Sequence, residues 1–209
     1  VFAYNFKHWK TQVGIQNLIL AGFKPQVILA ADSVKLSFYK SKTRIGPKDL
    51  FLTHPKEIAE CHDINYRVVV HNSEETASIV REMDLDVGVI LGARILKPIA
   101  FSEFNLGVLN MHPGLLPENR GLDNLKWAIL KNLPQGVTVH LIDKYIDRGQ
   151  LLCRESINIY EDDTLMDLHL RIQNLEQELM IRSLGHLKSE GVNSLQPLDK
   201  GEYHKSVPP

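Results

Sequence analysis

The chain has too few cysteines for two common kinds of small protein. Its 209 residues include 2 cysteines, which cannot build a disulfide framework or a cysteine-ligated zinc site. One disulfide is compatible with two cysteines, but a reducing cytosol is the simpler setting, so we expect a cytoplasmic protein. No apolar run approaches the length that crosses a bilayer, and the sequence shows no charged-then-apolar leader. We therefore expect no membrane partner.

The chain also lacks an excess of either charge. It carries 24 basic and 25 acidic residues, for a formal net charge of −1 with histidine neutral. Proteins that hold nucleic acid by bulk charge are strongly basic, so this balance argues against a nucleic-acid partner. Hydrophobic residues make up 44% and charged residues 23%, proportions typical of a soluble enzyme and too apolar for a disordered chain.

Several nucleotide and metal motifs are missing as well. No G-x-G-x-x-G follows the first expected strand, which weakens a dinucleotide-binding reading, and no G-x-x-x-x-G-K-[ST] loop is present. The 9 histidines contain no H-x-x-x-H pair, so we expect no metal. The chain begins at Val1 inside an apolar stretch, and we expect an initiator methionine and a residue or two before it.

The first half of the sequence alternates between two periodicities. Short apolar runs predict strands, helical spacing predicts helices between them, and Ser73 is placed to cap the last of these helices. The expected strands are 1–6, 26–31, 67–71 and 87–92, and the expected helices are 9–20, 54–61 and 74–83. Continuous apolar strands separated by helices are typical of a parallel sheet covered on both faces. The fold class is therefore α/β, a Rossmann-like, mostly parallel sheet with helices on both faces; residues 32–53 are not assigned.

The second half predicts further strands and two helices. The strands are expected at 108–111, 137–142 and 150–157, a helix capped by Asp123 runs to about residue 131, and a tail from Gly191 forms an extended cap or an edge strand. Thr164 and Asp167 form a capping-box pattern that opens a long amphipathic helix. The leucine stripe of this helix is expected to pack in the core. The alternative is that it forms the interface of a homodimer, and the sequence does not decide between the two.

The strongest local signal lies at the end of the strand at 108–111. It reads Asn110-x-His112-Pro113-x-Leu-Leu-Pro117, and the run Asp147-Arg148-Gly149 follows later. An amide, an imidazole and a carboxylate in one cleft suit acyl transfer. Asn110 can donate to a developing oxyanion, His112 can donate or move a proton, and Asp147 can orient the imidazole. No serine or cysteine occupies a nucleophile elbow, so direct attack by a substrate amine is favoured.

These motifs resemble those of the folate-dependent formyltransferases, the group that contains glycinamide ribonucleotide transformylase, the methionyl-tRNA formyltransferase catalytic domain and the sugar N-formyltransferases. The family's Asn-x-His-x-Ser-Leu-Leu-Pro is matched by residues 110–117, with Gly114 in place of serine. Its Asp-x-Gly is matched by 147–149 and its Arg-Ile-Leu-x-Pro by 94–98. The resemblance covers residues 87–191, and covers the earlier half by element order alone.

The resemblance implies a formyltransferase fold and a 10-formyltetrahydrofolate donor. By position it makes Asn110, His112 and Asp147 the catalytic residues. It places the pterin against the backbone of two segments, made up of Arg94, Ile95 and Leu96, and of Asp143, Lys144, Tyr145 and Ile146. A single catalytic domain is then expected over 1–209, with an acceptor-side half at 1–86, a folate-binding and catalytic half at 87–191 and a C-terminal extension at 192–209.

Acceptor contacts are less sharply indicated, and each candidate has a structural alternative. His8 and Lys10 can hold a phosphate or form a solvated turn, and Trp9 can be an aromatic platform or the start of a helix's apolar face. Arg120 can bind an acidic acceptor group or cap its loop. Thr138 can assist the site from its strand, and His140 on the same strand can face the cleft or be structural.

The expected acceptor is a small-molecule amine, by elimination a nucleotide-linked amino sugar for polysaccharide biosynthesis. The turn after the first strand lacks the glycines of the purine enzyme, and the length and charge disfavour a tRNA-binding or deformylating relative. Two alternatives are kept: glycinamide ribonucleotide formyltransferase of purine synthesis, and a non-catalytic folate- or nucleotide-binding domain of the same fold.

Overall fold

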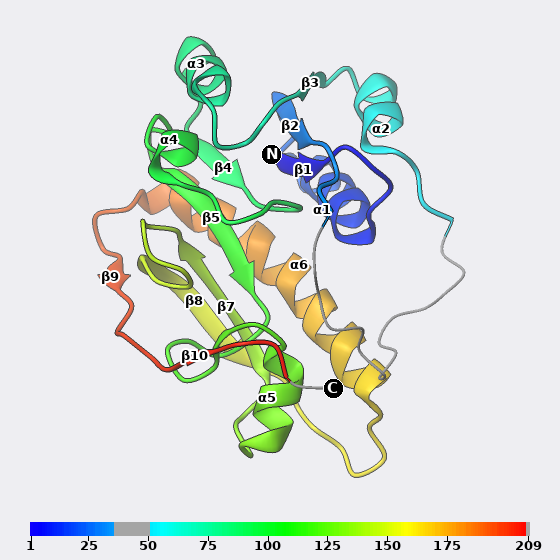
Figure 1. The fold of residues 1–209 in the computed structure, drawn as a ribbon, viewed down its shortest axis with the longest axis vertical. Helices are drawn as coiled ribbons and strands as arrows, with labels where there is room; N and C mark the ends of the chain where they lie inside the picture. The colour runs from blue at the N-terminus through cyan, green and yellow to red at the C-terminus, as the bar shows by residue number, and fades with distance from the viewer. Residues whose placement is uncertain (36–50, 208–209) are drawn as a thin grey trace. The chain divides into compact units, whose positions relative to one another are not determined.

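A computed structural model describes residues 1–35 and 51–207, which form two compact units (Figure 1). Within the described residues the first unit comprises 1–35 and 51–109, and the second comprises 110–207. The division falls inside the strand β5 (Gly107–His112), after Leu109, whereas the sequence places its two halves on either side of 86/87. Most of the unassigned stretch at 32–53 lies outside the described residues.

The first unit is built on a parallel sheet with helices between its strands. Its strands are β1 (Phe2–Tyr4), β2 (Val27–Ala31), β3 (Asn65–Val68), β4 (Val87–Val89) and the first half of β5, and its helices are α1 (Trp9–Leu20), α2 (Pro55–Cys61), α3 (Glu74–Glu82) and α4 (Pro98–Phe101). The pairs β1–β2, β2–β3 and β4–β5 are all parallel, and a parallel bridge from Phe2 to Ile90 joins the two groups of strands. The predicted alternation of strands and helices is confirmed.

Helix boundaries in this unit follow from capping side chains. His8 precedes α1, and its Nδ1 accepts a hydrogen bond from the Thr11 backbone N–H (3.3 Å). Ser73 caps α3 in the same way, because its hydroxyl accepts from the Thr76 N–H (3.3 Å). Each cap satisfies one of the N–H groups that the first turn of a helix leaves unpaired. The predictions for 9–20 and for the Ser73 cap are confirmed.

The strand expected at 67–71 is an exception. β3 instead spans Asn65–Val68 and lies at the edge of its three-stranded group, with Val68 49% and Val70 71% exposed. The strand prediction is confirmed only for Arg67 and Val68, because β3 begins two residues earlier and ends at Val68. The run of valines carries the β propensity of a core strand, but an edge strand has a neighbour on only one side, and propensity does not distinguish the two positions.

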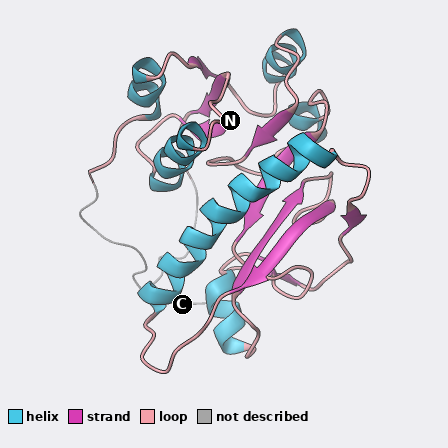
Figure 2. Ribbon diagram, turned by 180° about the vertical axis from the view of Figure 1, so that it is seen from behind, coloured by secondary structure: helices cyan, strands magenta, loops and turns pink. Residues whose placement is uncertain are grey.

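The second unit combines mainly antiparallel strands with one long helix. Its elements are the end of β5, β6 (Arg120–Gly121), α5 (Asn124–Leu130), β7 (Gly136–Leu141), β8 (Gln150–Ser156), α6 (Leu165–Glu190), β9 (Gln196–Pro197) and β10 (Tyr203–His204). β8 pairs antiparallel with β7 and β9, while β10 pairs parallel with β6. Figure 2 shows α6 lying across one face of β7 and β8.

The long helix begins and packs as its sequence predicts. Thr164 and Asp167 form both halves of a capping box, and a stripe that includes Leu168, Ile172 and Leu179 is buried. The tail does pair as short strands. Asp123 precedes α5 as expected but makes no side-chain cap; its backbone is left-handed (φ 52°), and its carboxylate instead accepts from the Val207 N–H (2.9 Å).

β7 differs from the half-buried strand that its alternation suggests, because all six of its residues are buried. The loop after β5 covers one of them directly: the Thr138 hydroxyl accepts from the Leu116 N–H (2.9 Å) and donates to the Gly114 carbonyl (2.8 Å). None of the helices in the described residues is long and apolar enough to cross a membrane.

Truncating the core of α6 tests this packing. Leu179 is 0% exposed and Leu170, on the same helix, is 38% exposed. We expect Leu179→Ala to lower the free energy of unfolding by about 2–5 kcal/mol through lost burial and a residual cavity. Leu170→Ala, the matched control, should change it by less than about 1 kcal/mol. Urea unfolding followed by circular dichroism measures both, and equal losses in the two variants would contradict the described packing.

Candidate active site

The signature side chains lie at the carboxyl end of β5. Asn110 and His112 are two residues apart on this strand, so their side chains leave it on the same side. Asp147 lies in the connection between β7 and β8, and all three residues belong to the second unit. His112 is 3% exposed, and the Asp147 side chain is 13% exposed. The structure therefore brings together the three residues that the motif spacing selected.

The imidazole of His112 has a hydrogen-bond acceptor at each ring nitrogen. Its Nδ1 lies 3.4 Å from Asp147 Oδ1, and its Nε2 lies 2.8 Å from the backbone carbonyl oxygen of Asn119. The second Asp147 oxygen accepts from the Gly121 N–H (2.9 Å). Burial alone would raise the pKa of Asp147, but the hydrogen bonds from His112 and Gly121 and the nearby imidazoles lower it below its usual value. Asp147 is thus ionised at neutral pH, and a proton lies on the His112 side of this contact.

A second histidine orients the amide of Asn110. His140 is 0% exposed, and its Nε2 lies 3.2 Å from Asn110 Nδ2. Burial, with a smaller contribution from His112, lowers the pKa of His140 to about 4. The ring is therefore neutral at pH 7: its Nδ1–H points to backbone carbonyls, including that of Leu141, and its Nε2 accepts from Asn110. One Asn110 N–H is held in this way, and the other has no acceptor within the part of the chain that the structure describes.

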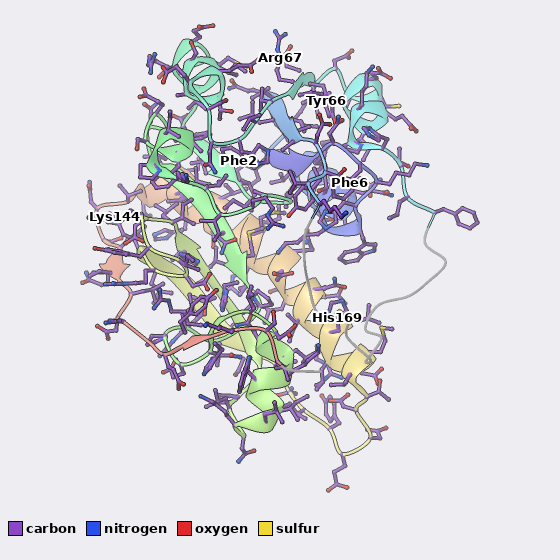
Figure 3. The ribbon with its side chains drawn as sticks, in the orientation of Figure 1. Phe2, Phe6, Tyr66, Arg67, Lys144 and His169 are labelled. Atoms are coloured by element: carbon purple, nitrogen blue, oxygen red, sulfur yellow. The ribbon has the colours of Figure 1, made fainter. Side chains whose placement is uncertain are left out.

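The turn that carries Asp147 is shaped by its own side chains. The Asp143 carboxylate accepts from the Tyr145 N–H (2.7 Å), and Gly149 has a positive φ of 104°. A Cβ at Gly149 would lie 2.0 Å from the Leu141 carbonyl oxygen, so only glycine fits this approach. The exposed Lys144 and the neighbouring Arg148 both lie over the Tyr145 ring (Figure 3, where Lys144 is labelled).

The other expected pterin segment belongs to the first unit. The Asn72 amide brackets it: Asn72 Nδ2 donates to the Ile95 carbonyl (2.9 Å), and Asn72 Oδ1 accepts from the Lys97 N–H (2.7 Å). Ile95 is 66% exposed and Leu96 is 8% exposed. The segment at 94–96 is thus a braced loop with an exposed aliphatic side chain.

The proposed acceptor residues differ in the freedom of their side chains. His8 uses Nδ1 to cap α1, and Trp9 is the first residue of that helix. In the second unit, Arg120 Nε donates to the Ile146 carbonyl (2.8 Å) and Arg120 Nη1 to that of Gly201 (3.3 Å), so this residue braces its loop. Thr138 is 0% exposed, and both hydrogen bonds of its hydroxyl go to the loop after β5.

Two site residues are not indicated by the sequence. Asn119 meets His112 through its backbone carbonyl, and Asn124 donates from Nδ2 to that same oxygen (2.8 Å). The contact is made by a backbone carbonyl, which every residue has, so no sequence motif could predict that Asn119 contacts His112. Within the described residues, no group of three or more His, Cys, Asp or Glu side chains is placed to hold a metal ion.

A half-buried amide and a buried imidazole at the end of β5, with a half-buried carboxylate beside the imidazole, suit acyl-type group transfer. The comparisons with known proteins agree with this class. A family model described as formyl transferase matches residues 30–184, most of the chain. The chain therefore belongs to the formyl transferase family.

Individual relatives carry several different names. Methionyl-tRNA formyltransferase of Chlorobium limicola is 34% identical over 129 residues, which cover 61% of this chain and 40% of that protein. The chain thus spans well under half the length of this curated relative, and the shared region identifies the family but not the acceptor.

Two solved structures share the fold. Phosphoribosylglycinamide formyltransferase from Bacillus halodurans is 23% identical, with a TM-score of 0.67 over 92% of this chain and 97% of that one. The formyltransferase PseJ from Anoxybacillus kamchatkensis, in complex with UDP-4,6-dideoxy-4-formamido-L-AltNAc and tetrahydrofolate, is 24% identical, with a TM-score of 0.55 over 77% and 83%.

The protonation of His140 can be tested directly. A pKa of about 4 in the folded protein, against an ordinary value of 6.5, means that only the unfolded chain binds this proton between these pH values. The contribution of His140 to stability should therefore be present above about pH 6.5 and lost as the pH falls towards 4. Its imidazole NMR signals, assigned by their absence in His140→Gln, should not titrate above about pH 5. A midpoint near pH 6.5 would contradict the described burial.

Proposed function

We propose that this protein transfers a formyl group from 10-formyltetrahydrofolate to the amine of a small acceptor. The observation that carries the proposal is the cluster in which the buried His112 contacts Asp147 and the buried His140 holds the amide of Asn110. Membership of the formyl transferase family supports the reaction class. The tetrahydrofolate bound to the similar structure from Anoxybacillus kamchatkensis supports the donor.

In the proposed reaction the neutral amine attacks the formyl carbon directly. A bond forms between the amine nitrogen and that carbon, and the bond from the carbon to the folate nitrogen breaks. The free N–H of Asn110 stabilises the negative charge that develops on the formyl oxygen. His112, held by Asp147, favours the same charge electrostatically. Asp147 helps to move the proton that the amine loses and the folate nitrogen gains.

For the donor we propose the turn Asp143–Ile146 of the second unit as a pterin contact, and we propose the braced loop at Arg94, Ile95 and Leu96 of the first unit as a pterin-binding surface in its own right. Both segments present backbone groups whose positions are set by neighbouring side chains, Asn72 in the first case and Asp143 in the second. Preorganised backbone groups suit the flat, hydrogen-bonding edge of a pterin.

For the acceptor we propose a nucleotide-linked amino sugar, held in part by His8, Trp9 and Lys10. The UDP-linked formamido sugar named in one similar structure supports this class. In the first unit, Phe6 (labelled in Figure 3) stacks on Tyr4, with ring centroids 4.8 Å apart, and is 37% exposed. The end of β1 therefore offers an aromatic surface suited to a base. Arg120 remains a candidate for an acidic acceptor group.

A mass-spectrometric screen with 10-formyltetrahydrofolate tests the acceptor. We expect a nucleotide-linked amino sugar to gain one formyl group while glycinamide ribonucleotide and methionyl-tRNA, the acceptors that other family members suggest, stay unmodified. Formylation of glycinamide ribonucleotide alone would identify the purine-pathway activity instead. Folate binding without turnover of any amine would favour a binding domain and would contradict the proposed reaction.

Substitution of the cluster tests the mechanism once an acceptor is known. We expect Asn110→Ala to lower kcat by about 10²–10³-fold through loss of the oxyanion donor. His112→Ala should lower it by about 10²–10⁴-fold. The control His62→Ala removes an exposed histidine in the first unit and should leave kcat unchanged. Near wild-type kcat in either cluster variant, folded by circular dichroism, would remove that residue from the mechanism.

A further inference from the structure

The contact between His112 and Asn119 determines which ring nitrogen carries a hydrogen. The oxygen of a backbone carbonyl only accepts hydrogen bonds, and His112 Nε2 lies 2.8 Å from that of Asn119. Nε2 must therefore be protonated and donate. The same oxygen lies 2.8 Å from Asn124 Nδ2, which donates to it as well, and the two donors lie 3.1 Å apart because they share one acceptor.

Asn119 and Asn124 also hold each other. While Asn124 Nδ2 donates to the Asn119 carbonyl, Asn119 Nδ2 donates to the Asn124 carbonyl (2.9 Å). Asn124 is the first residue of α5, so this reciprocal pair ties the loop after β5 to a helix. The two residues are 1% and 5% exposed, which shields both hydrogen bonds from water.

The pair leaves a buried group without a hydrogen-bond partner among the described residues. Asn119 Oδ1 is buried and accepts no hydrogen bond from the described residues. An exchange of its amide N and O would not help, because the oxygen would then face the Asn124 carbonyl. Such an orphan acceptor is unfavourable for folding, and buried unsatisfied groups in native proteins call for a reason beyond packing.

Gly114 makes room for this arrangement. A Cβ at this position would lie 2.8 Å from the Asn119 carbonyl oxygen and 3.2 Å from His112 Nε2. A serine, which the formyltransferase signature has at this position, would therefore push the Asn119 backbone away from the imidazole. The contact between Asn119 and His112 therefore depends on a glycine at position 114.

From these contacts we infer that Asn119 and Asn124, with Gly114 leaving the space, are positioning residues that keep a hydrogen on His112 Nε2 and direct the Nδ1 side of the ring at Asp147. They act through His112 and do not touch the reacting atoms. The role in catalysis rests on the proposed formyl transfer, whereas the effect on the imidazole does not.

The imidazole can be observed without any turnover. In protein labelled with ¹⁵N-histidine, two-bond ¹H–¹⁵N correlations report the hydrogen on each ring nitrogen. We expect the His112 Nε2 signal of the wild type to be that of a protonated nitrogen throughout pH 6–8. Asn124→Ala and, independently, Gly114→Ser should shift it, whereas Asn174→Ala, which removes an exposed asparagine of α6, should leave it unchanged.

Activity supplies a second readout on the same variants. We expect Asn124→Ala to lower kcat by about 10-fold or more, by analogy with residues that orient ligating histidines, with the KM for the formyl donor unchanged and a shifted pH profile of kcat/KM. Thermal unfolding identifies a variant that fails to fold, and the other variant then carries the test.

Wild-type His112 signals in a folded Asn124→Ala or Gly114→Ser protein would overturn the inference, even if activity fell. The opposite combination separates the two proposals. A shifted His112 signal in a protein that formylates no acceptor would sustain the positioning role and refute the proposed function.

Discussion

The hydrogen bond from His112 Nε2 to the Asn119 carbonyl is the contact on which the site in the second unit depends. It holds one side of a buried imidazole, and Asp147 at 3.4 Å faces the other side. Since both partners only accept, the ring needs a hydrogen on each nitrogen or a proton shared with Asp147. The loop after β5, the turn before β8 and the start of α5 all converge on this one ring. Each must keep its backbone in place for the others to be satisfied.

Two histidines in the same cluster are given different tasks by their surroundings. His140 is buried, which lowers its pKa to about 4, so its ring is neutral at pH 7 and serves as an acceptor for Asn110. His112 has a carboxylate beside it and cannot play that part. Surroundings that give neighbouring titratable groups different pKa values are characteristic of acid–base sites. The Asn110 amide and the His112 imidazole are thereby oriented before a substrate arrives, which is what electrostatic stabilisation of a transition state requires.

The family signature and the residues around it carry different information. Asn110, His112 and Asp147 are the positions that the sequence resemblance assigns to the reaction, and the proposed transfer rests on them. Gly114, Asn119 and Asn124 hold His112, one of these three residues, in its position. Neither group of residues indicates the acceptor. The first unit supplies an exposed aromatic surface at Phe6 and a helix capped by His8. These features suit a nucleotide, but they do not indicate which sugar is attached to it.

The sequence by itself determined the order of the longer elements, though not the short α4 and β6, together with the ends of α1, α3 and α6 and the three residues of the signature. These follow from periodicity, from capping side chains and from spacing, all of which act within a few residues. It could not separate the exposed edge strand β3 from a core strand, or predict that every residue of β7 is buried, because exposure depends on neighbours that are distant in the chain. Only the tertiary structure decided the role of His140 and brought Asn119 to His112. The first depends on burial by surrounding segments and the second on a backbone carbonyl, a group that every residue carries and no sequence pattern can mark.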